Sequence, residues 1–468
     1  MRLPEGTFRL DRSPRPPTGE TDWSGQAVSI EGAGAARTIL AAGGLLGPSG
    51  VSTPILRLDG AGSVRLSGLT FDGGFDAAPP RLARPDGERA SLLEIHHAES
   101  VLLRDVATRR SAHGRLPFRG DLAELGRSGP ASLVACGYVR IESGAIAFPS
   151  FGDGWWLIDC ETVDVRGLSY DGPEELVPGA VSTPLNVVGP KTGAIVLRDC
   201  RFARARGSAV NLGGRGPVHV SGCEFRGLIG ESNMVEGDPS RRPGPRAFGK
   251  GVDLGSEHQE DLFPDHPPLD DVLIERCSFL DLFSYSLRLV KRASTPASNV
   301  RIRENRFDNG FRGVELINVR RAVIERNRFS RIIKYTPSSA AMGRPLLIRS
   351  CSDIEVRENE FDGEAEARFR TLQDGDDAPR QSDVGIDLSN SRDVSIGSNT
   401  FYGFARAQVL VHNRRGDTPD MTRVRVSGNR FARPRNADRS WRAVAVRGSQ
   451  DGVTVDGNVE ESTPRDRR

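Results

Sequence analysis

Three ionisable residues stand at equivalent places in three consecutive segments of the chain. Asp253, Arg288 and Glu315 are the middle residues of the apolar triplets VDL, LRL and VEL. Alternate side chains of a strand point to opposite faces, so the flanking residues face a core and the ionisable residue faces outward. On neighbouring strands, the two carboxylates would lie roughly 9.6 Å apart at the backbone, with a guanidinium between them. Carboxyl groups about 6.5–9.5 Å apart suit an inverting glycosidase, in which one acts as acid and the other as base.

A second chemistry, β-elimination, uses the same residues. Arg288 or Lys291 would remove the proton next to a uronate carboxyl group, and a cation would neutralise that carboxyl. Asn211 and Asp253 would then hold calcium through their oxygen atoms. Hydrolysis requires no cofactor, so calcium enters only if the protein is a lyase. The catalytic candidates are therefore Asp253, Arg288, Glu315 and Lys291.

Charged side chains also point outward from the strands of proteins that are not enzymes. An Asp-Arg-Glu row across neighbouring strands is a favourable arrangement of opposite charges on a solvated surface. A non-catalytic glycan-binding or structural protein therefore remains an alternative to an enzyme. Displayed aromatic side chains would favour a binding module. The adjacent Trp155 and Trp156 are candidates, because a strand points one of the two outward.

Further polar residues are expected to contact a substrate. Asn211 and Asp387 are the middle residues of two more triplets, VNL and IDL. His258 lies in an insert that follows the Asp253 strand and is rich in acidic residues. The other candidates lie on neighbouring turns: Arg292, Lys334 and Tyr335. No metal site is predicted, because the six cysteines lack the CxxC spacing of such sites.

A short repeat carries these triplets. It reads apolar, any, apolar, two polar or small residues, a ladder residue, any residue and an aromatic, as in residues 300–307. Further copies cover residues 64–71, 163–170, 196–202, 218–225, 272–279, 322–329, 354–361, 394–401 and 424–431, and a degenerate copy covers 453–459. The closest copies are about 22 residues apart, which is enough for one coil of a β-helix. Each alternates with period two, as a strand does, and the strand with the triplet follows the aromatic.

Two positions of the repeat predict how the coils stack. The ladder position holds Cys200, Cys223, Cys277, Asn305, Asn327, Asn359, Asn399, Asn429 and Asn458. Asparagine tolerates the left-handed backbone of a tight turn, and stacked amides can hydrogen-bond from coil to coil. The cysteines are expected to be reduced thiols that act as small buried fillers. The aromatic position predicts an internal stack of phenylalanine rings.

The long inserts predict a groove. Segments near 76–90, 172–183, 229–249, 333–344, 363–383 and 432–441 all fall between the aromatic position and the triplet strand. They should form a wall along one corner of the coils, and the insert 255–268 should rise from the opposite edge. A row of charged residues between two walls has the shape that an extended polymer needs.

The pattern V-x-I-x-x-N-x-F followed by G-[IV]-x-L, present in residues 300–316 and 385–388, resembles the repeats of the pectate-lyase-like superfamily. These are right-handed parallel β-helices that include polysaccharide lyases, polygalacturonase-type hydrolases and alginate epimerases. The resemblance covers residues from about 3 to 459. It implies an all-β fold: a single right-handed parallel β-helix of about a dozen coils over residues 1–460, with long inserts at one corner and a disordered polar tail at 461–468.

The same resemblance implies a carbohydrate-active protein. Its substrate would be an acidic polysaccharide or oligosaccharide, cleaved in the groove by hydrolysis or β-elimination. A uronate C5-epimerase is the further alternative, because the superfamily hosts several chemistries on one fold.

Charge and hydropathy exclude other partners. The chain has 64 lysines and arginines and 62 aspartates and glutamates. Its net charge is therefore too small to favour binding to nucleic acid. No apolar run is long enough to span a membrane. The first residues contain no apolar signal core, which predicts a cytoplasmic protein as the sequence is written. A secreted or periplasmic protein is the alternative if a cap and a signal peptide precede residue 1. The oligomeric state is not predicted.

Overall fold

The computed structural model describes residues 1–10, 23–43, 46–47, 50–51, 54–75, 91–111, 129–150, 152–174, 181, 183–227, 250–255, 268–282, 284–332, 343–363, 382–413, 421–434, 441–448 and 452–461. These described residues form β-strands joined by turns, and they contain no helix. They divide into two compact units, the first ending at His219 and the second beginning at Val220. The expected all-β fold is thus confirmed, and the predicted loop walls fall largely outside the described residues.

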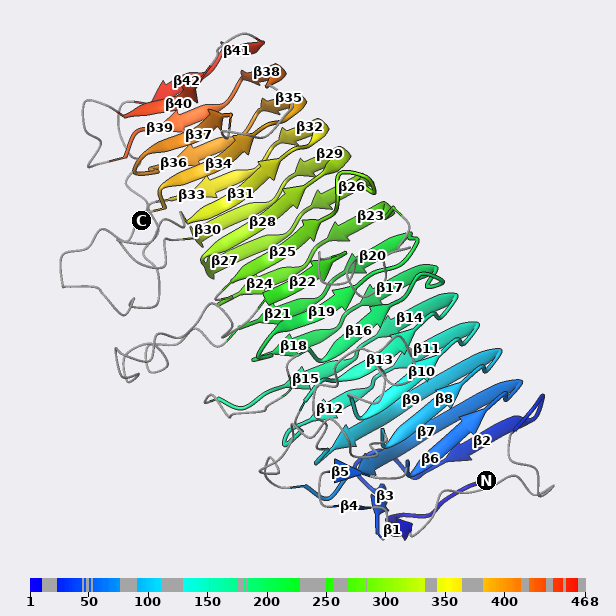
Figure 1. Ribbon diagram of the computed structural model, residues 1–468. Helices are drawn as coiled ribbons and strands as arrows, with labels where there is room; N and C mark the ends of the chain where they lie inside the picture. The colour runs from blue at the N-terminus through cyan, green and yellow to red at the C-terminus, as the bar shows by residue number, and fades with distance from the viewer. Residues whose placement is uncertain are drawn as a thin grey trace. The chain divides into compact units, whose positions relative to one another are not determined.

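The coils of the second unit are built from three kinds of short strand (Figure 1). The first strands are β23 (Asp270–Glu275), β26 (Ala297–Arg303), β29 (Val319–Glu325), β32 (Ser352–Arg357), β35 (Arg392–Gly397), β38 (Thr422–Ser427) and β41 (Val453–Asp456). The second strands are β21 (Glu224–Arg226), β24 (Ser278–Leu280), β27 (Arg306–Gly310), β30 (Arg328–Ile332), β33 (Glu360–Asp362), β36 (Thr400–Tyr402), β39 (Arg430–Ala432) and β42 (Val459–Glu461). The third strands are β22 (Lys250–Leu254), β25 (Tyr285–Val290), β28 (Arg312–Ile317), β31 (Arg344–Arg349), β34 (Val384–Ser389), β37 (Ala407–His412) and β40 (Arg442–Arg447).

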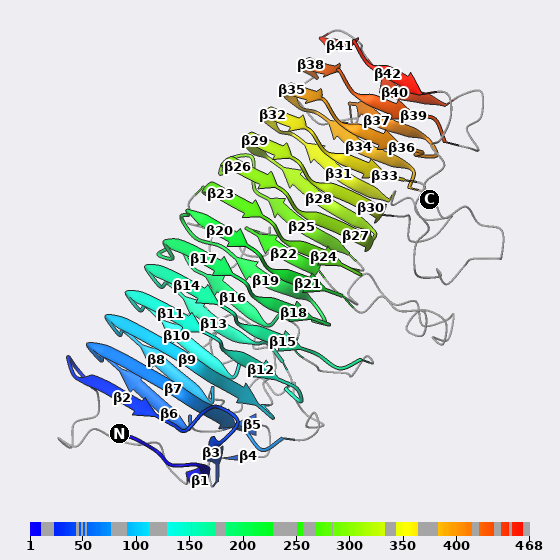
Figure 2. The same cartoon turned by 180° about the vertical axis from the view of Figure 1, so that it is seen from behind.

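Strands of one kind pair in parallel from coil to coil. The third strands of the second unit form one sheet in the order β22, β25, β28, β31, β34, β37, β40. The first and second strands pair in the same way, and Figure 2 shows them from behind. Parallel pairing of every third strand is the pattern of a β-helix coil, as the repeat predicted.

The first unit follows the same plan. Its third strands are β6 (Leu56–Asp59), β8 (Leu93–His96), β10 (Ala131–Val134), β13 (Trp155–Ile158), β16 (Leu185–Val188) and β19 (Ser208–Leu212), which pair in parallel in this order. Its other parallel strands are β1 (Gly6–Leu10), β2 (Ala27–Glu31), β3 (Thr38–Ala42), β7 (Ser63–Asp72), β9 (Ser100–Arg109), β11 (Tyr138–Glu142), β12 (Ala145–Ala147), β14 (Thr162–Arg166), β15 (Ser169–Asp171), β17 (Ala194–Arg198) and β18 (Arg201–Ala203). A short antiparallel pair is formed by β4 (Leu46–Gly47) and β5 (Gly50–Val51), and the division between the units falls within β20 (Val218–Ser221).

The predicted phenylalanine stack is present in the core of the second unit. Five successive pairs of rings are stacked with centroids 4.7–4.9 Å apart. The rings belong to Phe225, Phe279, Phe307, Phe329, Phe361 and Phe401, and each is fully buried. Glycines that precede third-strand triplets let the chain pass close to this stack. A methyl group at Gly313, for example, would lie 3.0 Å from Cδ1 of Phe329 and 2.2 Å from the carbonyl oxygen of Pro345.

The asparagine ladder is also confirmed. The side-chain amide of Asn305 donates to Oδ1 of Asn327 at 3.0 Å, and Asn327 donates to Asn359 at the same distance. The left-handed residue of the turn, however, is not the asparagine as expected but the residue before it, such as Glu304 with φ 57° or Arg326 with φ 53°. The preceding residue makes the turn because the ladder amide must point inward, where Asn305 Nδ2 also donates to the Ile274 carbonyl at 2.9 Å.

All six cysteines are free and buried, which confirms the expected reduced thiols. Cys223 and Cys277 occupy successive rungs of the ladder, since Ser278 N–H donates to the Cys223 carbonyl and Cys277 N–H to Oδ1 of Asn305. Cys351 lies at another corner, where burial raises the pKa of its thiol to about 12.

Thiol titration should therefore give two different counts. The unfolded chain, prepared without reductant, should yield six reactive thiols. The folded chain should react slowly, because burial shields the thiols and keeps Cys351 protonated at neutral pH. An unfolded count two or more short of six would show that a disulfide exists.

Candidate functional site

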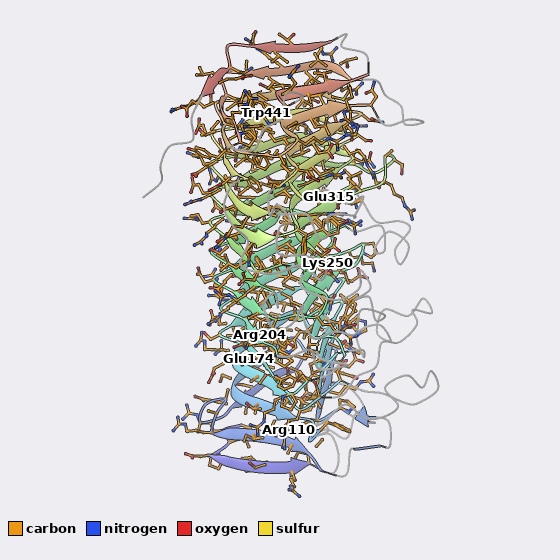
Figure 3. The ribbon with its side chains drawn as sticks, turned by 90° about the vertical axis from the view of Figure 1, so that its left-hand side faces the viewer. Arg110, Glu174, Arg204, Lys250, Glu315 and Trp441 are labelled. Carbon is orange, nitrogen blue, oxygen red and sulfur yellow. The ribbon has the colours of Figure 1, made fainter. Side chains whose placement is uncertain are left out.

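The third strands of the second unit place the three predicted catalytic residues in one row. Asp253 on β22 lies opposite Arg288 on β25, and Arg288 lies opposite Glu315 on β28. Their apolar flanking residues are buried in the core, so the three side chains project from the outer face of this sheet. Figure 3 labels Glu315 together with Lys250, the first residue of β22. We call Asp253, Arg288 and Glu315 the charged row.

The charged row is buried, which argues against the alternative of charges on a solvated surface. Asp253 is 5% exposed and Glu315 is 7% exposed. The side chain of Arg288 is 21% exposed. Charges taken out of water are costly unless they are paired. The row meets this condition by alternating in sign, so its burial depends on the arginine remaining between the two carboxylates.

Arg288 holds this row together. Its Nε donates to Oε2 of Glu315 at 3.2 Å. Burial alone would lower the pKa of Arg288, but the carboxylates of Asp253 and Glu315 outweigh burial and raise that pKa above its ordinary value. The guanidinium is therefore a permanent cation here. This argues against Arg288 as the base of a β-elimination, which must lose a proton before it acts.

Tyr285 and Arg312 lie beside the charged row, at the starts of β25 and β28. The Arg288 guanidinium lies 5.2 Å from the centroid of the Tyr285 ring, and the Arg312 guanidinium lies 4.6 Å from it. Arg312 also donates a hydrogen bond to the Tyr285 hydroxyl. Burial raises the pKa of Tyr285, and the Glu315 carboxylate adds to the rise, so the hydroxyl keeps its proton. Tyr285 was not predicted. It is the first residue of its strand and lies three residues before Arg288, and strand alternation places residues at an odd spacing on opposite faces.

Apolar side chains border Glu315 on the outer face. Val290, Ile317 and Leu347 form a buried cluster. Leu347 lies directly opposite Glu315 on the next coil, and Ile317 lies two residues further along the same strand. These neighbours cover the side of Glu315 that faces away from Arg288.

Lys291 lies at the edge of this face, and Arg292 follows it. Lys291 is 1% exposed and packs against Gly255, where a methyl group would come within 2.7 Å of its Cδ and 3.2 Å of its Nζ. Gly255 stands two residues after Asp253, so the structure brings Lys291 to the end of the Asp253 strand. Arg292 is exposed.

Asp387 belongs to the same outer face, beyond Leu347. Its carboxylate is 2% exposed and joins two residues that were not predicted. Oδ2 pairs with Nε of Arg344 at 2.8 Å, and Oδ1 lies 2.7 Å from Nε2 of His412. The only sequence signal for His412 was its place at the end of an apolar strand, two residues after the triplet position. The contact to Asp387 is diagonal and crosses coils, so strand parity does not reveal it.

The other residues that were predicted to contact a substrate do not lie on this face among the described residues. Asn211 lies on β19 of the first unit, where its amide donates to Oδ1 of Asn186 at 2.9 Å. His258, Lys334 and Tyr335 lie outside the described residues. Within the part of the chain that the structure describes, no group of three or more histidine, cysteine, aspartate or glutamate side chains is arranged to hold a metal ion.

A family model supports the fold. Residues 293–463 match the family described as "Right handed beta helix region". The predicted right-handed parallel β-helix is thereby confirmed for these residues. Among curated protein sequences, none matches the chain. No helix among the described residues is long and apolar enough to cross a membrane.

Several solved structures are similar at low identity. The periplasmic alginate epimerase AlgG is 11% identical over 98% of this chain and 85% of its own, with a TM-score of 0.41. Tailspike protein 3 of bacteriophage CBA120 is 11% identical over 98% of this chain and 56% of its own, with a TM-score of 0.46. PfbA, a surface adhesin of Streptococcus pneumoniae, is 12% identical over 95% of this chain and 84% of its own, with a TM-score of 0.42. None of these likenesses assigns an activity to this chain.

Proposed function

We propose that the protein is a carbohydrate-active enzyme that cleaves an acidic polysaccharide by glycoside hydrolysis on the outer face of the second unit's third strands. The observation that carries the proposal is the buried charged row, in which Arg288 separates Asp253 from Glu315. Two coil steps of about 4.8 Å put the two backbones roughly 9.6 Å apart. Side chains that lean together bring the carboxyl groups into the range of about 6.5–9.5 Å that inverting glycosidases use.

The surroundings of the charged row favour an acidic substrate. Arg312 and Arg344 open neighbouring third strands, and Lys291 lies at the other end of the face. A guanidinium is a preferred partner of a carboxylate because its planar N–H groups match the two oxygens. A uronate carboxylate placed between the strands would compete with Glu315 for Arg288.

This competition suggests which carboxyl group is the acid and which is the base. When the substrate carboxylate takes over Arg288, Glu315 loses its cation while Ile317 and Leu347 still exclude water from it. Glu315 then acts as the general acid that protonates the leaving oxygen. Asp253 acts as the base that removes a proton from the attacking water. Tyr285, which keeps its proton, donates a hydrogen bond to the sugar ring.

A β-elimination is the second candidate, with Lys291 as the base. The observation in its favour is the complete burial of Lys291 beside the end of the Asp253 strand. Calcium would be required only in this case, to neutralise the uronate carboxylate.

A product assay separates these functions. The purified chain is incubated with a panel of acidic polysaccharides, and new reducing ends are measured alongside the ultraviolet absorbance of unsaturated uronate ends. Hydrolysis predicts reducing ends without unsaturated ends. If unsaturated ends form in an amount equal to the new reducing ends, the reaction is elimination and not hydrolysis. Binding to a polysaccharide without either product would show a non-catalytic glycan-binding protein.

A further inference from the structure

The outer face of the third strands in the first unit holds two buried polar groups that have no hydrogen-bond partner among the described residues. Ser132 on β10 is fully buried, and Trp156 on β13 is 7% exposed. Within the part of the chain that the structure describes, neither the Ser132 hydroxyl nor the indole N–H of Trp156 has a hydrogen-bond partner. The two residues lie directly opposite one another in the strand register, so the two unsatisfied groups are neighbours. Native proteins pair nearly all buried polar groups, and such an exception calls for an explanation.

Both neighbours in the same row are polar and buried. Glu94 lies opposite Ser132 on one side, and Asn186 lies opposite Trp156 on the other. Each is 1% exposed. The carboxylate of Glu94 accepts from the Ser91 N–H at 3.1 Å and lies 4.0 Å from Nε of Arg57. We call Glu94, Ser132, Trp156 and Asn186 the polar row.

The tryptophan of the polar row is fixed in place. Its Cδ1 edge lies against Gly129, where a methyl group would approach it to 2.9 Å. Its ring packs with Val134, Ile158 and Val188, which form an apolar cluster on the outer face of the sheet. The adjacent Trp155 points inward instead, where its Nε1 donates to the Thr108 hydroxyl at 2.9 Å. The two tryptophans therefore differ: the inward indole is satisfied and the outward one is not.

The chemistry of the polar row defines what it can bind. An indole N–H only donates, an ionised carboxylate only accepts, and a serine hydroxyl does both. A ligand that satisfies them together must carry groups that donate and accept, which is the property of a hydroxyl. The apolar cluster beside the row suits the C–H face of a pyranose ring.

We infer that the polar row is a sugar-binding subsite in the first unit, in which the indole N–H of Trp156 and the hydroxyl of Ser132 bind hydroxyl groups of a glycan ring. Because these side chains are screened from bulk water, a bound ligand or an ordered water molecule would satisfy them. The subsite does not depend on the proposed hydrolysis, since it belongs to the other unit and binds through hydroxyl groups, not through charge.

The test is a calorimetric titration of the full chain with cellohexaose and with hexagalacturonate. All proteins carry Glu315→Gln, so that no glycosidic bond is cleaved during the measurement if the charged row is catalytic. Ser132→Ala and Trp156→Phe each delete one unsatisfied group, and Trp156→Phe keeps an aromatic ring at that position. Each should weaken binding about three- to tenfold, as expected for a lost hydrogen bond. Ser132→Ala should not lower the stability of the free protein, because no protein partner is lost.

Trp441→Phe is the matched control. Trp441 is also 7% exposed, but its Nε1 donates to the Phe404 carbonyl at 3.1 Å. This variant should bind both oligosaccharides as tightly as the parent. The inference is overturned if the parent binds neither probe, or if Ser132→Ala and Trp156→Phe bind as tightly as the control. A crystal structure of the complex that shows only an ordered water between Ser132 and Trp156 would overturn it as well.

Discussion

Replacing Glu315 with glutamine should lower kcat on the acidic polysaccharide by at least about a hundredfold. Glutamine keeps the size of the side chain and its contacts with Ile317 and Leu347, but it cannot deliver a proton to the leaving oxygen. Asp253→Asn should have a similar effect, because an amide cannot accept a proton from water. The measurement is the initial rate of reducing-end formation at saturating substrate. The double variant should be scarcely slower than either single one, since the two groups act in one step.

Both substitutions touch a buried ion pair, so folding must be measured alongside activity. Removing one partner of such a pair leaves a charge out of water and lowers the free energy of unfolding. The rates are therefore compared at a temperature at which far-ultraviolet circular dichroism shows every variant fully folded. Glu355→Gln is the control, because Glu355 lies on β32, outside the third strands, and its side chain is 46% exposed. Full activity of folded Glu315→Gln would exclude Glu315 as the acid.

Replacing Phe329 with alanine should cost about 3–5 kcal/mol of unfolding free energy. Its ring is fully buried between Phe307 at 4.7 Å and Phe361 at 4.8 Å, and its edge contacts the position of Gly313. The coils above and below are held by hydrogen bonds at a fixed spacing, so the cavity cannot collapse. The measurement is the midpoint of urea unfolding.

The control for this substitution is Phe148→Ala. Phe148 is 38% exposed, so its removal leaves no enclosed cavity and should shift the midpoint only slightly. A loss below about 1 kcal/mol for Phe329→Ala would show that the stack contributes little to stability.

Local patterns predicted the repeating parts of the fold because the interactions repeat. The period-two alternation and the spacing of the copies were enough to align Asp253, Arg288 and Glu315 on adjacent strands. The same alignment placed Phe329 between Phe307 and Phe361 in the core. It also stacked Asn305 on Asn327, because one amide per coil at a constant position can reach the next.

Features that depend on three-dimensional context were not predicted. The burial of the charged row is set by what surrounds the outer face, and strand parity says nothing about that. Tyr285 and Arg312 meet at the starts of their strands, where alternation no longer fixes side-chain direction. The pairing of His412 with Asp387 crosses coils diagonally. The left-handed residue before each ladder asparagine follows from the inward hydrogen bonds of the amide and not from residue preference.

The central claim is that the charged row binds and cleaves an acidic glycan. Its most direct test is a crystal structure of the Glu315→Gln variant with an oligosaccharide of the polysaccharide that the native chain cleaves. We expect a glycosidic oxygen within hydrogen-bond distance of the residue 315 side chain, a water held by Asp253 on the opposite face of the ring, and a uronate carboxylate on Arg288. An oligosaccharide that occupies the second unit without touching any residue of the charged row would contradict the claim.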